Sequence, residues 1–182
     1  MKALIPVAEG SESLETVTIV NVLRRADVDV TVASIGADRR IAGTRGITLT
    51  ADALFADVAN QDFDLIALPG GESGARALAQ CVPLMDKLRG QRLNHRWYGA
   101  ICAAPAFALS PHGLLDGKQA TCYPAFREQL LHFVDRPVVV DGHCITSQGP
   151  ATAMAFALQL VEVLCGAARR KEIAADLLHQ GQ

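Results

Sequence analysis

The sequence lacks the cysteine pairs and the long apolar runs that would place it in a disulfide-rich or membrane class. Its five cysteines, an odd number, include no C-x-x-C pair, which argues against a disulfide framework. The first residues reach Glu9 too soon for the apolar core of a signal peptide, and no stretch approaches the ~20 apolar residues of a membrane span. We therefore expect a soluble, cytoplasmic protein with reduced thiols and no membrane partner.

Strong charge and metal-ligand spacing are also missing. The formal net charge is -2, and no long run of either sign occurs, so nucleic acid is not expected as a partner. The five histidines and five cysteines do not show the paired spacing of a structural zinc site. We predict no metal and no cofactor.

What the sequence does contain is enough apolar material for one folded unit. Half of the 182 residues are hydrophobic and a fifth are charged, as in an average globular domain. A chain of this length buries roughly 70% of the surface that its unfolded form exposes. No repeat, linker or low-complexity segment divides it, so we assign a single domain over residues 1–182.

Short β-branched runs alternate with longer helical patterns along the chain, which is typical of βαβ units and a mainly parallel sheet. The expected strands cover residues 2–7, 28–34, 47–50, 65–68, 97–101, 119–122, 138–140 and 143–146. The expected helices cover residues 14–26, 75–93 with a break near Pro83, 104–109, 126–133, 151–165 and 169–178. The predicted fold class is α/β, a mainly parallel sheet with helices on both faces.

Cys102 lies between an expected strand and an expected helix, with small residues two positions to either side. This is the pattern of a strained elbow that presents a nucleophile, because bulky neighbours would clash in so sharp a turn. A helix amino terminus would also favour thiolate over thiol. The alternative is an ordinary buried cysteine. Cys144 and Cys165 fit strand or helix patterns and are expected in the core, whereas Cys81 and Cys122 lack the elbow context.

Glu15 begins the helix that follows the first expected strand. In a parallel sheet this junction opens at the same edge as the Cys102 elbow, so the two side chains can meet. The pairing is favourable if Glu15 keeps its proton and donates a hydrogen bond to sulfur. The alternative is a carboxylate that complements the helix dipole, a role that Glu12 fits better.

Backbone N–H groups near the elbow could stabilise a developing oxyanion. Gly70 and Gly71 follow a buried strand, and Ala103 follows the cysteine. We expect these three residues to supply such donors, although Pro-Gly-Gly by itself signals only a turn.

Several stretches together resemble the ThiJ/PfpI superfamily, and specifically its Parkinson-disease-protein-like branch with the bacterial YajL-type proteins. The resemblance runs from Lys2 to about Leu178. The stretches that carry it are Gly10-x-x-x-x-Glu15, Leu23-Arg24-Arg25-Ala26, Val30-Thr31-Val32-Ala33, Leu68-Pro69-Gly70-Gly71, Ala100-Ile101-Cys102-Ala103-Ala104-Pro105 and Thr146-Ser147-Gln148-Gly149-Pro150-Ala151-Thr152. The resemblance implies a flavodoxin-like sandwich of the class I glutamine-amidotransferase type, usually a homodimer.

The resemblance also implies roles for particular residues. Cys102 would be the nucleophile and Glu15 its protonated partner. Arg45, and Arg25 from a second subunit, would bind anions near the pocket, unless they are ordinary surface arginines. Many relatives have a histidine directly after the cysteine or at the position of Tyr123, and this sequence has neither. His112, in the loop after the elbow helix, is a fallback, although a structural role suits it better.

Three functions follow from this resemblance, in order of preference. The first is a cysteine-dependent, glutathione-independent glyoxalase or deglycase that converts small α-oxoaldehydes, methylglyoxal and glyoxal, to 2-hydroxy acids. The second is a non-enzymatic oxidative-stress sensor or chaperone that acts through oxidation of Cys102. The third is a cysteine peptidase or amidase, which the missing imidazole weakens because a thiol protease needs a base. Isonitrile hydratases belong to the same superfamily and remain open.

Overall fold

The computed structural model describes residues 1–179, and a seven-stranded sheet forms its centre. The strand order is β5-β2-β1-β6-β7-β9-β8, and all neighbouring pairs are parallel except β8 with β9. The strands are β1 (Lys2–Val7), β2 (Asp29–Ser34), β5 (Ala53–Leu54), β6 (Leu65–Leu68), β7 (Trp97–Ile101), β8 (Val138–Asp141) and β9 (Cys144–Ser147). A separate antiparallel hairpin joins β3 (Arg40–Ala42) and β4 (Thr48–Thr50).

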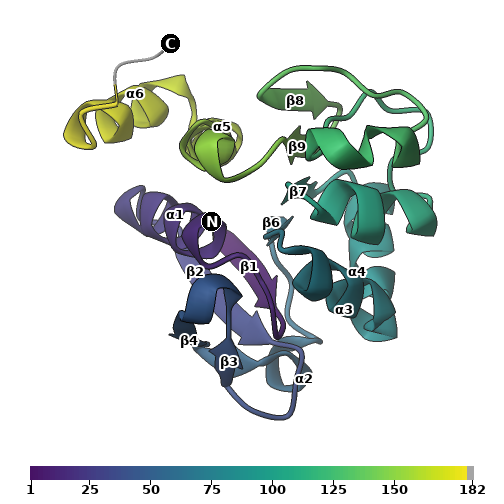
Figure 1. Cartoon of the computed structure of the whole chain (residues 1–182). Helices are drawn as coiled ribbons and strands as arrows, with labels where there is room; N and C mark the ends of the chain where they lie inside the picture. Colours follow the sequence, from purple (N-terminus) through teal and green to yellow (C-terminus); the bar gives the residue numbers. More distant parts are fainter. Residues whose placement is uncertain (180–182) are drawn as a thin grey trace.

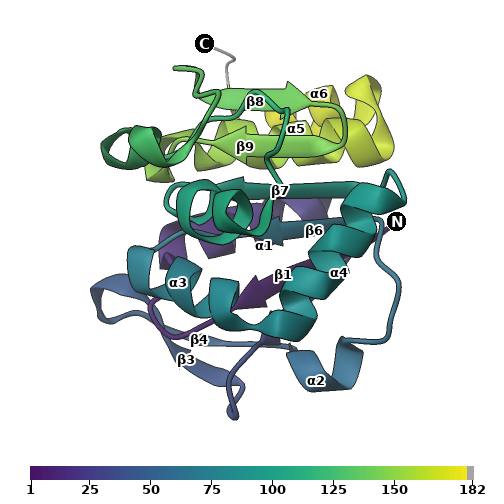
Figure 2. The ribbon, with the colours of Figure 1, turned by 90° about the vertical axis from the view of Figure 1, so that its right-hand side faces the viewer.

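Helices cover both faces of the sheet. Figure 1 shows α1 (Ser13–Arg25), α5 (Ala153–Cys165) and α6 (Ala167–Asp176) on one face. Figure 2 shows α3 (Glu72–Gln80) and α4 (Val82–Leu93) in front of the opposite face, with the short α2 (Phe55–Val58) below them. Two apolar cores follow, one between each helical layer and the sheet. The predicted α/β sandwich with a mainly parallel sheet is confirmed.

The central position of β1 explains its composition. It pairs with β2 on one side and β6 on the other, so both of its faces meet helices and residues 3–7 are all buried. A strand covered on both faces reads as a continuous apolar run. On α1, by contrast, Ile19, Val22 and Leu23 face the sheet, while Leu14 and Val17 are exposed.

The break predicted near Pro83 is confirmed. Helix α3 ends at Gln80, and α4 begins at Val82 with the proline in its first turn. Proline fits there because the first N–H groups of a helix have no partner within it. Cys81, in an extended conformation, connects the two helices.

The strand predicted over residues 119–122 is wrong, and the helix predicted over 126–133 is present only in its first half. The first segment forms only an isolated bridge, Ala120 with Phe133, because the N–H of Thr121 donates to the Thr146 hydroxyl instead of a strand carbonyl. In the second, a 3₁₀ helix runs over Pro124–Gln129 and Leu130 is extended. The bridge holds Phe133 outside any helix.

Other boundaries differ in smaller ways. The elbow helix is a single π-type turn, Pro105–Leu109. A 3₁₀ turn, Pro150–Thr152, precedes α5. The hairpin strand β3 and helix α2 were not predicted, since glycine and short elements obscure any periodicity there. Within residues 1–179, no helix has the length and apolar character needed to cross a membrane.

Candidate active site

The site lies at the carboxyl edge of the sheet, between β1 and β6. From β1 the chain winds outward in one direction to β2 and β5, and from β6 it winds in the other direction. Ligands of open α/β sheets bind at such a switch point. The loops that follow β1, β6 and β7 bring Glu15, Gly70 and Cys102 together there.

Cys102 has the strained backbone that the elbow predicts. Its φ is 64°, in the left-handed region, which costs a non-glycine residue about 1 kcal/mol. Two hydrogen bonds fix its peptide groups: the Cys102 N–H donates to the Ser147 carbonyl at 2.9 Å, and the Tyr123 N–H donates to the Cys102 carbonyl at 2.8 Å. The thiol is therefore held in one place by two separate chain segments.

Glu15 is completely buried in the first turn of α1. Its Oε2 accepts the Gly70 N–H at 2.7 Å, and among residues 1–179 no hydrogen-bond partner reaches the buried Oε1. Burial raises the pKa of this carboxyl to about 7, although the hydrogen bond from the Gly70 N–H lowers it. The Cys102 thiol lies within hydrogen-bonding reach of the carboxyl. Glu12, the competing carboxylate, accepts the Leu14 N–H as the helix cap. Glu15 therefore changes protonation near neutral pH.

Two glycines make the close approach possible. A Cβ on Gly70 would lie 2.5 Å from the Cys102 Cβ and 2.8 Å from the Glu15 Oε2. Gly71 has a φ of 81°, and a Cβ there would lie 2.2 Å from the Gly10 carbonyl oxygen. Any side chain at position 70 would push the thiol and the carboxyl apart.

The predicted preference of a helix amino terminus for the Cys102 thiolate is present, but burial and an ionised Glu15 outweigh it. Burial raises the pKa of the thiol to about 12, and the Glu15 carboxylate is the next cause. The N–H groups of Gly71 and Ala103 hydrogen-bond the sulfur and lower the pKa, without outweighing burial. A single π-type turn offers too few aligned peptides for a strong dipole.

Gly70 requires a second correction. It was expected to donate to an oxyanion, but its N–H is bonded to Glu15. Gly71 and Ala103 are the backbone donors that face the sulfur. An oxyanion that forms on a carbon bound to that sulfur would lie near these two groups.

Of the three residues expected to bind substrate or anions, only Tyr123 is hydrogen-bonded directly to Cys102. Arg45 is exposed at a φ of 57°, in a loop joined to the start of α1 by the hydrogen bond from the Thr44 N–H to the Ser11 carbonyl. Arg25 lies at the far end of α1, where it donates to Asn21, so within one chain it does not reach the site. Tyr123, partly exposed, is adjacent through its bond to Cys102.

His112 does not approach Cys102 in a catalytic arrangement. Its Nδ1 lies 3.3 Å from a guanidinium nitrogen of Arg89, on the exposed side of α4. The structure therefore gives this histidine a surface partner and removes it as a base for the thiol.

The other cysteines are free thiols outside the elbow. Cys122 and Cys144 are buried, and Cys81 is half-buried. Cys165 was expected in the core but is also half-buried, because it ends α5 next to the turn into α6. No cluster of three or more metal-ligating side chains occurs within the described range, 1–179.

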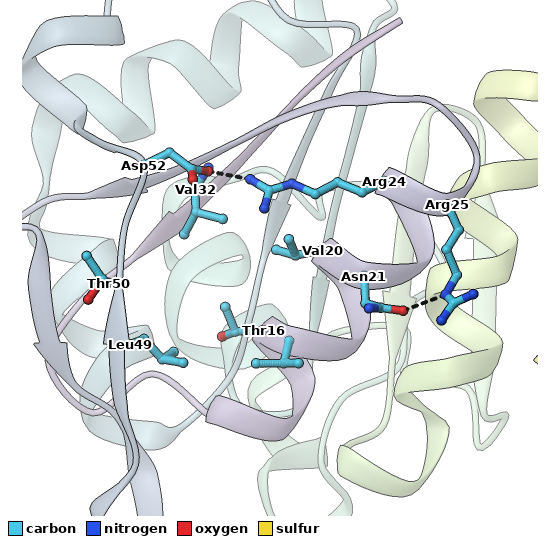
Figure 3. A pocket seen from close by; sticks show the side chains of 10 residues that line it. Thr16, Val20, Asn21, Arg24, Arg25, Val32, Leu49, Thr50 and Asp52 are labelled. Carbon is cyan, nitrogen blue, oxygen red and sulfur yellow. Dashed lines mark hydrogen bonds and ion pairs between the residues drawn. The ribbon is translucent and has the colours of Figure 1, made fainter.

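The pairing of Cys102 with Glu15, and not the volume of a hollow, locates this site. A hollow of about 530 Å³ lies between α1 and the β2–β4 region (Figure 3) and holds neither Glu15 nor Cys102 among its lining residues. A smaller one of about 210 Å³ is lined by Tyr123, Pro124 and residues 148–152. Only the smaller hollow borders the segments that hold Cys102.

A profile of the DJ-1/PfpI family matches residues 1–163. The chain belongs to the DJ-1/PfpI family. The structure is closely similar to that of oxidised DJ-1 from Toxoplasma gondii, with a TM-score of 0.97, 40% identity and 99% of each chain covered. The chain therefore has the flavodoxin-like fold of the DJ-1/PfpI family.

Curated relatives in the DJ-1/PfpI family differ in length. Protein DJ-1 homolog B of Arabidopsis thaliana is 44% identical over 97% of this chain and 41% of its own length. The chain thus spans about four tenths of that relative. The glutathione-independent glyoxalase DJR-1.2 of Caenorhabditis elegans is 33% identical over 87% of this chain and 85% of its own length.

Sequence reasoning missed the part played by Ser147. Its carbonyl holds the Cys102 N–H, and its hydroxyl lies 2.6 Å from that of Thr152. The stretch Thr146-Ser147-Gln148-Gly149-Pro150-Ala151-Thr152 was already a family signature. That signature was the available signal, but it does not say which backbone atom would face the cysteine.

Proposed function

We propose that this protein is a cysteine-dependent, glutathione-independent glyoxalase that converts α-oxoaldehydes such as methylglyoxal and glyoxal to 2-hydroxy acids in stress protection. The observation that supports it best is the buried Glu15 carboxyl, with its pKa raised to about 7, within hydrogen-bonding reach of Cys102. A nucleophile beside a proton carrier that titrates near neutrality suits this isomerisation. The name of the Caenorhabditis elegans relative favours the same activity.

In the proposed reaction the pair shares one proton. When that proton moves to Glu15, the repulsion of the carboxylate disappears, and the Gly71 and Ala103 N–H groups can stabilise a thiolate. The thiolate adds to the aldehyde carbon, and the oxygen takes the proton from Glu15 to give a hemithioacetal. No metal or organic cofactor is required for this step.

The rest of the cycle moves one proton between the two carbons and one between their oxygens, and it consumes one water. Glu15, now a carboxylate, removes the proton on the former aldehyde carbon, which leaves an enediolate. The hydroxyl proton passes to the neighbouring oxygen and Glu15 returns its proton to the neighbouring carbon, giving a 2-hydroxy thioester. Water then breaks the carbon–sulfur bond and releases the 2-hydroxy acid and the free thiol. The net change is oxoaldehyde plus water to hydroxy acid, with no external oxidant or reductant. The same first addition on glycated amino groups would give deglycase activity.

The test is lactate formation from methylglyoxal without glutathione, in wild type, Cys102→Ser and Glu15→Gln. Cys81→Ala is the matched control, since Cys81 is half-buried between α3 and α4. We expect Cys102→Ser to abolish turnover, Glu15→Gln to lower it at least about 100-fold, and Cys81→Ala to retain it. If the wild-type protein forms no more lactate than buffer alone, the proposal is wrong.

A second candidate is a redox sensor or stress chaperone. The N–H groups of Gly71 and Ala103 face the sulfur, and a protonated Glu15 lies beside it, so a sulfinate formed there by peroxide would be hydrogen-bonded. The Toxoplasma gondii structure is of an oxidised DJ-1. Peroxide titration followed by intact mass tests the idea, which fails if Cys102 is not oxidised selectively.

A cysteine peptidase has less support, because His112 is paired with Arg89 and no histidine replaces it at Ala103 or Tyr123. A thiol protease would need such a base.

We further propose a cytoplasmic homodimer. Leu14, Val17 and Ile47 are about half exposed. Val17, Val20 and Leu49 line the hollow between α1 and the β2–β4 region that Figure 3 shows. A second copy on this face would bring its Arg25 toward the site, as the family resemblance implies. Val17→Glu is expected to convert dimer to monomer in analytical ultracentrifugation, and a monomeric wild type would overturn the proposal.

A further inference from the structure

We infer that the hollow lined by Tyr123, Pro124 and residues 148–152 binds the carbon substituent of the oxoaldehyde, and that it favours a flat apolar group such as a phenyl ring. The inference rests on the proposed glyoxalase function, and it names the substrate class that this site would prefer.

The hollow is lined by the two chain segments that hold the backbone of the nucleophile. Ser147 accepts the Cys102 N–H and Tyr123 donates to the Cys102 carbonyl. The lining begins with Tyr123 on one segment and with Gln148 on the other. We take this surface as the nearest hollow that a group attached to a carbon on the Cys102 sulfur could enter.

The Thr152 hydroxyl and the Gln148 amide nitrogen of the lining already have partners within the protein. The Thr152 hydroxyl bonds the N–H and the carbonyl of Gly149 and lies 2.6 Å from the Ser147 hydroxyl. The Gln148 amide donates to Asp135 at 2.7 Å. No charged side chain lines the hollow. Its free surface is therefore mainly proline, alanine and the aromatic ring of Tyr123, with the Tyr123 hydroxyl as a polar tip, which suits an uncharged, largely apolar substituent.

The aromatic wall is held in position. A Cβ on Gly149 would lie 3.4 Å from Tyr123 Cδ2, so the ring lies against that backbone. The Phe126 ring is 5.8 Å away between centroids, and Phe107 packs edge-on against Phe126 at 4.7 Å. Arg76 in turn lies 3.8 Å over the Phe107 ring. A ring supported in this way needs little ordering when a ligand binds.

The volume of the hollow also favours a phenyl substituent over a methyl substituent. The hollow measures about 210 Å³, and a cavity of roughly 150 Å³ in an engineered apolar core binds benzene. A phenyl group would therefore fill most of the space, whereas the methyl group of methylglyoxal would leave it to water. Because the larger group buries more apolar surface against the wall, its advantage would appear in kcat/KM.

The experiment compares kcat/KM for phenylglyoxal, which yields mandelate, and for methylglyoxal, which yields lactate. Tyr123→Ala removes the wall, and Ala151→Leu fills the hollow from its exposed rim. Tyr123→Phe keeps the ring. Leu131→Ala, at an 87% exposed position outside the lining, is the control.

We expect the ratio of phenylglyoxal to methylglyoxal kcat/KM to fall about tenfold in Tyr123→Ala and in Ala151→Leu. Tyr123→Phe and Leu131→Ala should keep the ratio within about twofold. Turnover of methylglyoxal with the same ratio in Tyr123→Ala and Ala151→Leu overturns the inference alone. Turnover of neither aldehyde by the wild type overturns the proposed function and the inference with it.

Discussion

Two thiols in this protein, the partly exposed Cys102 and the buried Cys144, share a raised pKa but differ in backbone conformation and in their partners. Burial is the first cause of a pKa of about 12 at both Cys102 and Cys144. Cys144 lies in regular strand β9 opposite Tyr98, a phenol whose own pKa is raised by burial. Cys102 lies on a left-handed elbow beside a carboxyl that titrates near 7. Proton exchange with a partner, rather than the pKa of the thiol alone, distinguishes the candidate site.

The largest expected difference is in alkylation. Cys102 is partly exposed, whereas Cys144 is 2% exposed within the sheet. Iodoacetamide at pH 8 should label Cys102 roughly 100-fold faster than Cys144, which requires local opening. Peptide mapping by mass spectrometry measures both rates in one sample, with full labelling in urea as the control. Similar rates would remove the distinction between the two thiols.

Gly70→Ala should disable the site by geometry alone. The new Cβ would lie 2.5 Å from the Cys102 Cβ, which forces the thiol and Glu15 apart. We expect an activity loss of about 100-fold and a destabilisation of about 1–3 kcal/mol.

Gly90→Ala is the matched control for this change. Gly90 lies inside α4 with no heavy atom within 4 Å of a Cβ, so the variant should keep activity and gain about 0.5–1 kcal/mol. Methylglyoxal turnover and urea unfolding report both quantities. An active Gly70→Ala enzyme would show that the close approach is unnecessary.

These expectations show how far residue types alone determine the site. The small residues around Cys102 and the position of Glu15 after the first strand predict both the elbow and its partner. They do not predict that Gly70 donates to Glu15 while Gly71 and Ala103 face the sulfur, because the direction of a backbone N–H depends on the φ and ψ of the finished loop. Likewise Thr121 reads as strand, but the Thr146 hydroxyl takes its N–H.

The pairing of Cys144 with Tyr98 was not predicted for a related reason. Each residue lies in a strand that the pattern identifies, yet only the register of β7 against β9 places them opposite each other. Register between distant strands is set by the packing of the whole sheet.

The pH dependence of stability should sharpen the contrast further. Glu15 has a pKa raised from 4.5 to about 7 in the folded protein. The folded state therefore binds more protons than the unfolded chain between these values, and stability that is fully present below pH 4.5 is lost as the pH rises through 7.

Glu15→Gln lacks this dependence. The free energy of unfolding of wild type, relative to this variant, should fall by about 3 kcal/mol from pH 4 to 7.5. Urea unfolding at several pH values measures the difference. Parallel curves for the two proteins would contradict the raised pKa.

The smallest expected effect comes from changing Tyr98, which lies opposite Cys144 in the sheet. The Tyr98 hydroxyl donates to the Leu114 carbonyl at 2.8 Å in a buried setting, and Tyr98→Phe leaves that carbonyl unpaired. We expect a loss of about 1–2 kcal/mol with methylglyoxal turnover unchanged. A large loss of turnover would mean that the Cys144 region is coupled to the site.

The order of the strands has a further consequence for the newly made chain. Glu15, Gly70 and Cys102 follow β1, β6 and β7, and β6 lies between the other two strands. Such long-range parallel pairing forms slowly. A nascent or partly folded chain therefore displays an ordinary cysteine with no proton partner, and the special reactivity appears only once all three strands have joined.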